Sequence, residues 1–456
     1  MKRDLTKGNI FSNLMFMSIP AILGHLAKSF YDIVDMFWIG RISPSAVAGV
    51  TVFSSILFFI WVLSSVIGTS SVSMISQSFG AKNEKRAKEV IEQAISFKVL
   101  VAIFTMAVVW PFLPRIIEFI SDDPTVISNA LSYGYVRLAF LPILFAAATM
   151  NTALMCVGNS QKAMTIMIST ALLNIVLDPI MMFETIPFIG ISGLGLGVVG
   201  AAWATNIANL VAVSLGLFFL ISGRANIKIR FRGLFRLIPE IDKKLLTIGA
   251  PLGLEMLSRE GANLIAIKIM ALYGTSAIAS VGVTFRLIGL SFMIMMGLGD
   301  GAGAIIGQNL GKRQIKRAED TAKLTAKISA SINAIVFIFV LFFAKNIIGV
   351  FTDSAEVIYY GSILIKAMTF SMMFFSYSFG LSSAFFGSGY NKPFMVASVI
   401  SRWAVQMPAL FMVAVVFELP FVAAAIAFAV AELSEGIIMT AFYYKGKWKE
   451  MQVVAH

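Results

Sequence analysis

Long apolar stretches separated by short polar connections run through the whole chain. A helix that crosses a bilayer needs about 20 predominantly apolar residues. Windows of this kind recur twelve times, so the pattern predicts an all-α membrane protein with twelve transmembrane helices. They are expected at residues 13–38, 46–77, 89–112, 130–156, 162–183, 195–222, 244–271, 276–307, 319–343, 358–386, 393–416 and 420–444.

Several short motifs repeat at one constant spacing of 231 residues, which indicates an internal duplication. Six helices return the chain to its starting side, so the halves are expected to share one orientation, as in known transporters. We expect two pseudo-symmetric six-helix bundles: an N-terminal lobe at 1–222, a basic linker at 223–243 and a C-terminal lobe at 244–456. The matching motifs are Ser45-Ala-Val-Ala-Gly-Val50 with Ser276-Ala-Ile-Ala-Ser-Val281, Gln77-Ser-Phe-Gly80 with Gln308-Asn-Leu-Gly311, and Pro20 with Pro251.

Composition places the chain in lipid and excludes several kinds of chemistry. Of 456 residues, 58% are hydrophobic and only 13% are charged, whereas a soluble protein carries about 25% charged residues. The single cysteine allows no intrachain disulfide, and two histidines leave little for a histidine metal site or catalytic triad. No Walker-type phosphate loop is present. We therefore expect no enzyme activity and no cofactor.

The net charge of +12 is explained by where the basic residues lie. They gather in alternate connections, at the amino terminus, 78–88, 157–162, 223–243, 308–318 and 387–392, and in the tail, whereas the other side offers Arg41, Arg115 and Lys345. The positive-inside rule makes the basic side cytoplasmic. We expect a multi-pass cell-membrane protein with both termini in the cytoplasm, whose partner is the lipid bilayer. Nucleic acid is not required.

One predicted helix carries an acid and an amide in an otherwise apolar run. Asn174 and Asp178 are four residues apart, so both side chains lie on one helical face. An aspartate at mid-membrane costs about 2.5–3.5 kcal/mol, so it normally faces a partner or a water-filled cavity. Pro179 allows the helix to bend, as does Pro20 in the first helix. The alternative role for Asp178 is a structural hydrogen bond to a neighbouring helix.

The first predicted helix carries a polar stripe. His25, Lys28, Asp32 and Asp35 follow a 3-4-3 spacing and share one face. Lys28 and Asp32 are one turn apart and are able to neutralise each other. Such a pair would leave Asp35 available to an ion.

The repeat is not chemically symmetric. Asp35 falls opposite Ala266, and Asp178-Pro179 falls near Met407-Pro408, so the second half keeps the proline without the acid. Glu255 and Arg259 have the spacing of a helical ion pair. Polar groups of the second half that are candidates for a substrate cleft or a second coupling site are Glu255, Arg259, Glu260, Arg286, Asp300 and Arg402.

Several short motifs, taken in their order along essentially the whole chain, resemble those of the multidrug and toxic compound extrusion (MATE) transporters. The matching motifs are Ser18-Ile-Pro20, Tyr31-x-x-x-Asp35, Ile39-Gly-Arg41, Asn174-x-x-x-Asp178-Pro179, Gly197-Val-Val-Gly-Ala-Ala202 and the paired Gln-x-x-Gly turns.

The resemblance implies two lobes that alternate between outward and inward openings, and export driven by entry of Na⁺ or H⁺. Matching motifs of the prokaryotic type assign the cation ligands to Asp35, Asn174, Asp178 and Thr205, with Tyr31 nearby. These hard oxygen ligands suit a small alkali cation, and close carboxylates are equally able to share protons. Asp32 departs from the pattern, because the similar transporters usually have a neutral amide there.

We expect a secondary antiporter that works as a monomer and exports amphipathic, cationic organic compounds. Two alternatives remain at this point. The first is a flippase for lipid-linked saccharides, because Arg259, Arg286 and Arg402 suit an anionic pyrophosphate head. The second is a membrane-embedded enzyme or receptor without net transport.

Overall fold

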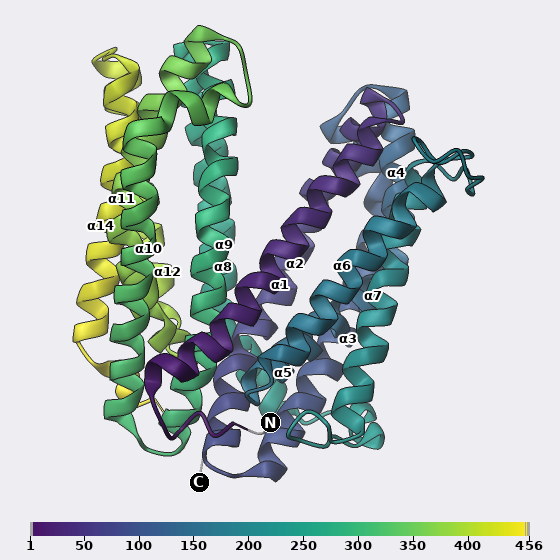
Figure 1. The fold of residues 1–456 in the computed structure, drawn as a ribbon, viewed down its shortest axis with the longest axis vertical. Coiled ribbons are helices and arrows are strands. Elements are labelled where there is room, and N and C mark those ends of the chain that lie inside the picture. Colours follow the sequence, from purple (N-terminus) through teal and green to yellow (C-terminus); the bar gives the residue numbers. More distant parts are fainter. Residues whose placement is uncertain (1–2, 452, 454–456) are drawn as a thin grey trace. The chain divides into compact units, whose positions relative to one another are not determined.

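The computed structural model describes residues 3–451 and 453, and its regular structure is helical throughout this part of the chain. Figure 1 shows the helices as long rods joined by short connections. In the first half they are α1 (Ile10–Gly40), α2 (Pro44–Gly80), α3 (Glu84–Ile120), α4 (Pro124–Ala139), α5 (Leu141–Cys156), α6 (Ser160–Met182) and α7 (Val198–Ile221).

A short 3₁₀ turn, η1 (Phe231–Phe235), leads into the second half. The helices there are α8 (Pro239–Met270), α9 (Thr275–Gly311), α10 (Ile315–Gly349), α11 (Ala355–Ser388), α12 (Lys392–Val399), α13 (Met407–Phe411) and α14 (Phe421–Tyr444). The π-helical stretch η3 (Ile400–Gln406) joins α12 to α13, and a second one, η4 (Met412–Val416), continues the same span. Two 3₁₀ turns are η2 (Ala271–Tyr273) and η5 (Lys447–Lys449).

Eleven of the twelve predicted spans correspond to described helices that are long and apolar enough to cross a membrane, if one bent pair of helices is counted as a span. The span expected at 130–156 consists of α4 and α5, which meet at an angle of 55°. Pro142 is the second residue of α5, where a missing N–H is tolerated because the first turn has no intrahelical acceptor for it. Among the described residues, ten helices are long and apolar enough to span a membrane, and this bent pair would be an eleventh. The remaining predicted span, α8, is long enough, but its charged residues, which include Glu255, Arg259 and Glu260, exclude it from this count.

The internal repeat appears in the helix bounds. Pro44 and Thr275, where α2 and α9 begin, are 231 positions apart, as are Gly80 and Gly311, where the two helices end. The duplication therefore preserves the lengths of helices as well as short motifs.

The helices form two compact units, and α1 contributes to both. The first unit contains Leu23–Thr247, whereas the second contains Asp4–Ile22 and the described residues from Ile248 onward. Within the second unit, the Ser18 hydroxyl donates to the Leu298 carbonyl of α9 at 3.5 Å. A Cβ at Gly301 would lie 2.4 Å from Ser18 Oγ, so α1 and α9 pack this closely because that residue is glycine.

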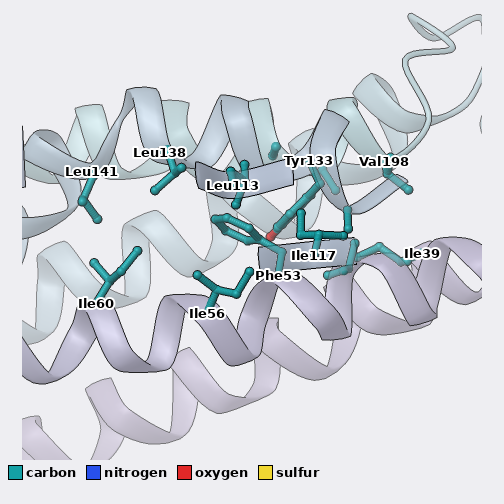
Figure 2. Close-up of a cluster of buried hydrophobic side chains, with 14 of the residues drawn as sticks. Ile39, Phe53, Ile56, Ile60, Leu113, Ile117, Tyr133, Leu138, Leu141 and Val198 are labelled. Atoms are coloured by element: carbon teal, nitrogen blue, oxygen red, sulfur yellow. The ribbon is translucent and has the colours of Figure 1, made fainter. Parts of the chain in front are cut away.

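In the first unit, a cluster of buried apolar side chains joins α2, α3 and α4 (Figure 2). The rings of Phe53 and Tyr133 meet edge to face with centroids 5.7 Å apart. A Cβ at Gly134 would lie 2.5 Å from the Phe53 ring, so the absence of a side chain there makes room for it. In the second unit, Phe379 and its neighbours form a comparable apolar core.

The outer surface of the helices is apolar as well. Phe104, Phe342 and Val350 are 70%, 72% and 81% exposed. Apolar exposure of this extent is unfavourable in water but matches a lipid environment. The surface therefore agrees with the hydropathy of the sequence.

Candidate functional site

Four helices of the first unit bring polar side chains into its apolar interior. They are α1, α4, α6 and α7, and α6 packs along the length of α7 (Figure 1). Three of the four predicted cation ligands, on α6 and α7, are almost fully buried: Asp178 is 0% exposed, Asn174 is 1% and Thr205 is 7%.

The contacts of these three residues leave several oxygens without a partner. Asn174 Nδ2 donates to Thr205 Oγ1 at 3.3 Å, and the Thr205 hydroxyl is also within 3.1 Å of the Ala201 carbonyl. Both carboxylate oxygens of Asp178 and the amide oxygen of Asn174 are buried without a hydrogen bond in the described structure. Since buried polar groups are nearly always paired, this concentration of unpaired acceptors marks a site that needs a proton or a cation.

The fourth predicted ligand, Asp35, interacts electrostatically with one of the other three, Asp178. Asp35 on α1 is half-buried, and its Oδ1 is buried without a hydrogen-bond partner. The carboxylates of Asp35 and Asp178 are close enough to repel each other electrostatically. Two like charges in a low-dielectric interior favour uptake of a cation or a proton.

Two other residues of the polar stripe on α1, Lys28 and Asp32, are more exposed than Asp35. Lys28 and Asp32 form the expected ion pair at 3.3 Å, and both side chains are about half exposed. Tyr31 is half-buried, with its ring centroid 5.8 Å from the Lys28 ammonium, and His25 is half-buried too. Because Asp32 is paired with Lys28, Asp35 is the acid of this stripe that interacts with the buried Asp178.

A buried arginine, which the sequence analysis did not single out, lies beside these acids. Arg137 on α4 is 8% exposed and donates from Nη1 to Asn206 Oδ1 at 2.9 Å, while Asn206 Nδ2 donates to the Val136 carbonyl at 2.9 Å. Its positive charge attracts the Asp35 carboxylate electrostatically. The signal was present, because an arginine inside the predicted span at 130–156 is as costly as an aspartate.

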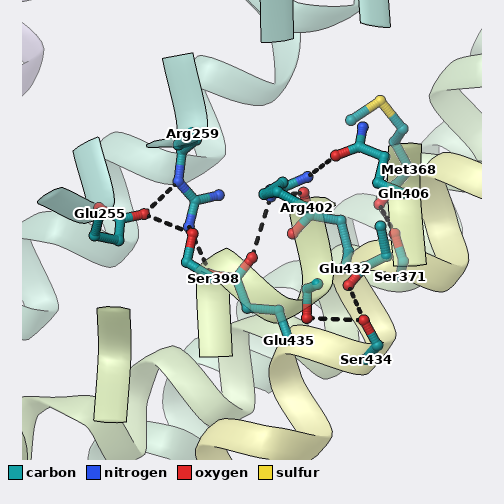
Figure 3. Close-up of polar contacts among 12 residues, drawn as sticks. Glu255, Arg259, Met368, Ser371, Ser398, Arg402, Gln406, Glu432, Ser434 and Glu435 are labelled. Carbon is teal, nitrogen blue, oxygen red and sulfur yellow. Dashed lines mark hydrogen bonds and ion pairs between the residues drawn. The ribbon is translucent and has the colours of Figure 1, made fainter. Parts of the chain in front are cut away.

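The second unit holds a larger buried network, formed by α8, η3 and α14 (Figure 3). Arg259 donates to Glu255 Oε1 and to Glu435 Oε1, both at 2.6 Å. Arg402 donates to Glu432 Oε1 at 2.6 Å and to Glu435 Oε2 at 3.2 Å. The predicted pair of Glu255 and Arg259 is therefore confirmed, and Arg402 finds its acids on another helix.

Two polar side chains complete this network. Ser398 donates to Glu255 Oε1 at 3.0 Å and accepts from Arg259 Nη2 at 3.2 Å, while Gln406 Oε1 accepts from Arg402 Nη1 at 3.0 Å. Arg402 and Gln406 belong to the π-helical stretch η3, a conformation that is often found at functional sites.

The two units thus place buried polar groups on corresponding helices but satisfy them differently. In the second unit, each carboxylate of the network accepts hydrogen bonds from a guanidinium. In the first unit, the Asp178 carboxylate has no such donor. The first unit is consequently the one in which buried carboxylate oxygens, among them those of Asp178 and Asp35 Oδ1, lack a hydrogen-bond partner in the described structure.

The other predicted residues lie outside both groups. Glu260 is half-buried on α8, whereas Arg286 and Asp300 are exposed on α9. Pro20 and Pro179 lie inside α1 and α6, which continue as helices beyond them.

The arrangement in the first unit suits a small hard cation or a proton. Carboxylate, amide and hydroxyl oxygens are the ligands that alkali cations prefer. Among the described residues, no group of three or more histidine, cysteine or acidic side chains is arranged to hold a metal ion.

Comparisons with known proteins identify the family and agree with the fold. The MatE family model matches twice, at residues 20–180 and 251–412, so the two matches follow the internal repeat. Probable multidrug resistance protein YoeA of Bacillus subtilis (strain 168) is 23% identical over 454 residues, which are 98% of this chain and 96% of that protein. Multidrug export protein MepA of Staphylococcus aureus (strain MSSA476) is 24% identical over 416 residues, 91% of this chain and 89% of that protein.

Solved structures share the fold. A MATE structure in the straight conformation has a TM-score of 0.89 and 21% identity, covering 98% of each chain. A MOP superfamily transporter from Pyrococcus furiosus Vc1 has a TM-score of 0.88 and 22% identity, covering 97% of this chain and 96% of that one.

Proposed function

The chain belongs to the MatE family of membrane transporters, and from this premise we propose that it is a secondary antiporter. It exports amphipathic, cationic organic compounds in exchange for Na⁺ or H⁺ by alternating access. The names of the relatives, which include multidrug export proteins, support the substrate class. The exchanged cation is a transported substrate and not a cofactor.

One observation carries the assignment of the coupling site. The unpaired oxygens of Asp178 and Asn174 lie in the buried interior of the first unit, with Thr205 hydrogen-bonded to Asn174 and the Asp35 charge nearby. We assign Asp35, Asn174, Asp178 and Thr205 as the groups that take up the cation. A protein pays for such buried, unpaired acceptors only where a ligand satisfies them during function.

The path from cation binding to a change of state runs through α1. Asp35 lies in the part of α1 that belongs to the first unit, whereas residues before Leu23 belong to the second. Neutralising the charge of Asp35 and Asp178 removes their mutual repulsion and allows α1 and α6 to approach each other. Pro20 and Pro179 reduce the stiffness of these helices where they would bend.

The test uses purified protein in liposomes, with pH and sodium gradients imposed separately and a cationic dye as the transported compound. Asp178→Asn keeps the shape of the side chain and removes its charge. We expect this variant to lose gradient-driven dye movement, and the gradient that drives the wild type identifies the coupling ion.

Asp122→Asn is the matched control, because Asp122 is exposed in the connection between α3 and α4. Its coupled transport should equal that of the wild type. Undiminished coupled transport by Asp178→Asn would show that the coupling site lies elsewhere.

The position of the basic connections supports a location in the cell membrane with both termini in the cytoplasm, and the protein is proposed to work as a monomer. Cysteine accessibility from each side of oriented vesicles tests the orientation. A flippase for anionic lipid-linked saccharides is disfavoured, because Arg259 and Arg402 are already paired with glutamates.

A further inference from the structure

The basic connection between α7 and α8 has two distinct faces. Ala225, Ile227 and Ile229 are 0%, 3% and 1% exposed, whereas the cations Arg224 and Lys228 on the alternating positions are exposed. The segment is a series of turns, and its Ala225 and Ile229 N–H groups donate to the Phe219 and Leu220 carbonyls at the end of α7, both at 3.1 Å. The connection is therefore docked on the first unit with its positive charges outward.

Polar side chains near the start of α3 hold the next part of this connection in place. Glu92 Oε1 accepts from the Arg230 backbone N–H at 2.7 Å, and Gln93 Oε1 accepts from the Ile238 N–H at 2.7 Å. Glu92 and Gln93 are 8% and 1% exposed, so these hydrogen bonds are shielded from water. A Cβ at Gly233 would lie 2.0 Å from Glu92 Oε2, so any other residue there would displace the Glu92 carboxylate from this contact.

Between these two attachment points, the connection presents large apolar side chains outward. Phe231, Phe235 and Leu237 are 56%, 78% and 49% exposed, and the two phenyl rings meet with centroids 5.4 Å apart. Arg232 and Arg236 are exposed among them and form no ion pair within the part of the chain that the structure describes. A backbone attached to α3 by hydrogen bonds thus displays an apolar cluster together with exposed cations.

The depth of this cluster is set by its attachment to α3. Glu92 lies about two turns from the start of α3, close to residue 89, where the sequence predicts that the apolar span begins. The predicted start of the span therefore places the displayed side chains at the level expected for the lipid headgroups. Aromatic rings favour this zone, and exposed cations there meet lipid phosphates.

We propose that residues 224–237 form an interfacial anchor that binds anionic phospholipids. Phe231, Phe235 and Leu237 enter the boundary between headgroups and acyl chains, while Arg232 and Arg236 contact the phosphates. Charge complementarity and continuity with a membrane span favour a lipid occupant over a protein partner or a second copy of this chain. The proposal does not depend on the coupling site in the first unit.

The test follows the anchor with a fluorescent probe. In full-length protein, Cys156→Ala removes the single native cysteine, and Leu237→Cys carries an environment-sensitive fluorophore. The protein is placed in liposomes that contain brominated phosphatidylglycerol or, in parallel, brominated phosphatidylcholine. We expect quenching by the anionic lipid to be at least about twofold stronger.

Two sets of variants separate the contributions. Replacing Arg232 and Arg236 by glutamine should remove the preference for the anionic lipid, whereas replacing Phe231 and Phe235 by serine should weaken quenching by both lipids. The control is glutamine at the exposed Lys82 and Lys85, which removes the same charge from another basic connection and should leave the preference intact.

Equal quenching by both lipids in the unsubstituted anchor would overturn the proposal. Quenching by neither lipid would also overturn it, and cross-linking of the probe between chains would then identify a second copy as the occupant. Because the readout is lipid contact, it distinguishes failure of the anchor from failure of the antiport mechanism.

Discussion

Arg402→Gln is the substitution that most directly tests the buried network of the second unit. Arg402 is 4% exposed and donates to Glu432, Glu435 and Gln406. Its loss leaves three glutamates with one arginine. Glutamine is too short to reach all three acceptors and carries no charge.

The magnitude follows from how the remaining charges are satisfied. Removing one partner of a buried ion pair costs about 3–5 kcal/mol, because the other charge is left without compensation. Arg402 compensates two carboxylates and leaves Glu432 with no other guanidinium in the network, so we expect about 4 kcal/mol. For a unit of roughly 150–250 residues, each kcal/mol lowers the unfolding midpoint by about 2–4 °C, which gives a decrease of about 10 °C.

The assay is thermal unfolding in detergent, followed by the loss of monodisperse protein on size-exclusion chromatography. Glu435→Gln should cost less, because two glutamates then balance two arginines and each arginine keeps one carboxylate at 2.6 Å. Arg286→Gln is the matched control, since Arg286 is exposed and surface changes are usually within about 0.5 kcal/mol. A midpoint for Arg402→Gln that equals that of the control would refute the reasoning.

Three further predictions concern the first unit, helix packing and pH. Arg137→Gln removes a positive charge beside the carboxylates and should raise the apparent cation affinity in proteoliposome flux by about tenfold, or about 1.4 kcal/mol; unchanged affinity would contradict a role for this charge. Gly380→Ala should lower the unfolding midpoint by the equivalent of about 1–3 kcal/mol, because its Cβ would lie 2.4 Å from Ala326 Cα; Gly282→Ala, with open space, should not. Burial raises the pKa of Asp242, outside the spans, to about 6, so its contribution to stability is present at low pH and is lost as pH rises through that value. Asp242→Asn should therefore be more stable than the wild type above about pH 6 but not near pH 4. A difference in unfolding midpoint between the two proteins that is the same at both pH values would contradict this.

The sequence was sufficient for the helices because lipid leaves the backbone few choices. In a bilayer each peptide group must be satisfied internally, so an apolar run of sufficient length becomes a helix. Helix bounds therefore followed from hydropathy, and the 231-residue repeat followed from motifs within those helices. The bend between α4 and α5 was not predicted. Hydropathy does not distinguish a proline at the start of a new helix, such as Pro142, from a proline inside a continuous helix.

The candidate site was only partly accessible from the sequence. The four-residue spacing of Asn174 and Asp178 fixes their common face, because helix geometry is local. The hydrogen bond of Asn174 to Thr205, however, joins α6 to α7. The spacing of residues along one helix does not predict the distance between side chains on two helices. The sequence therefore identified a costly acid, and the assignment of Thr205 rested on resemblance.

Partners across helices were decided by the tertiary structure alone. Arg402 has no acid within its own helical segment, yet it meets Glu432 and Glu435 of α14. Arg137 similarly meets Asn206 through the packing of α4 on α7. By itself the sequence determined which segments cross the membrane and where charge is costly, because both depend on local composition. Which charges are neutralised and which carboxylates stay unpaired depends on how the helices pack, because an ion pair forms only where two helix faces meet.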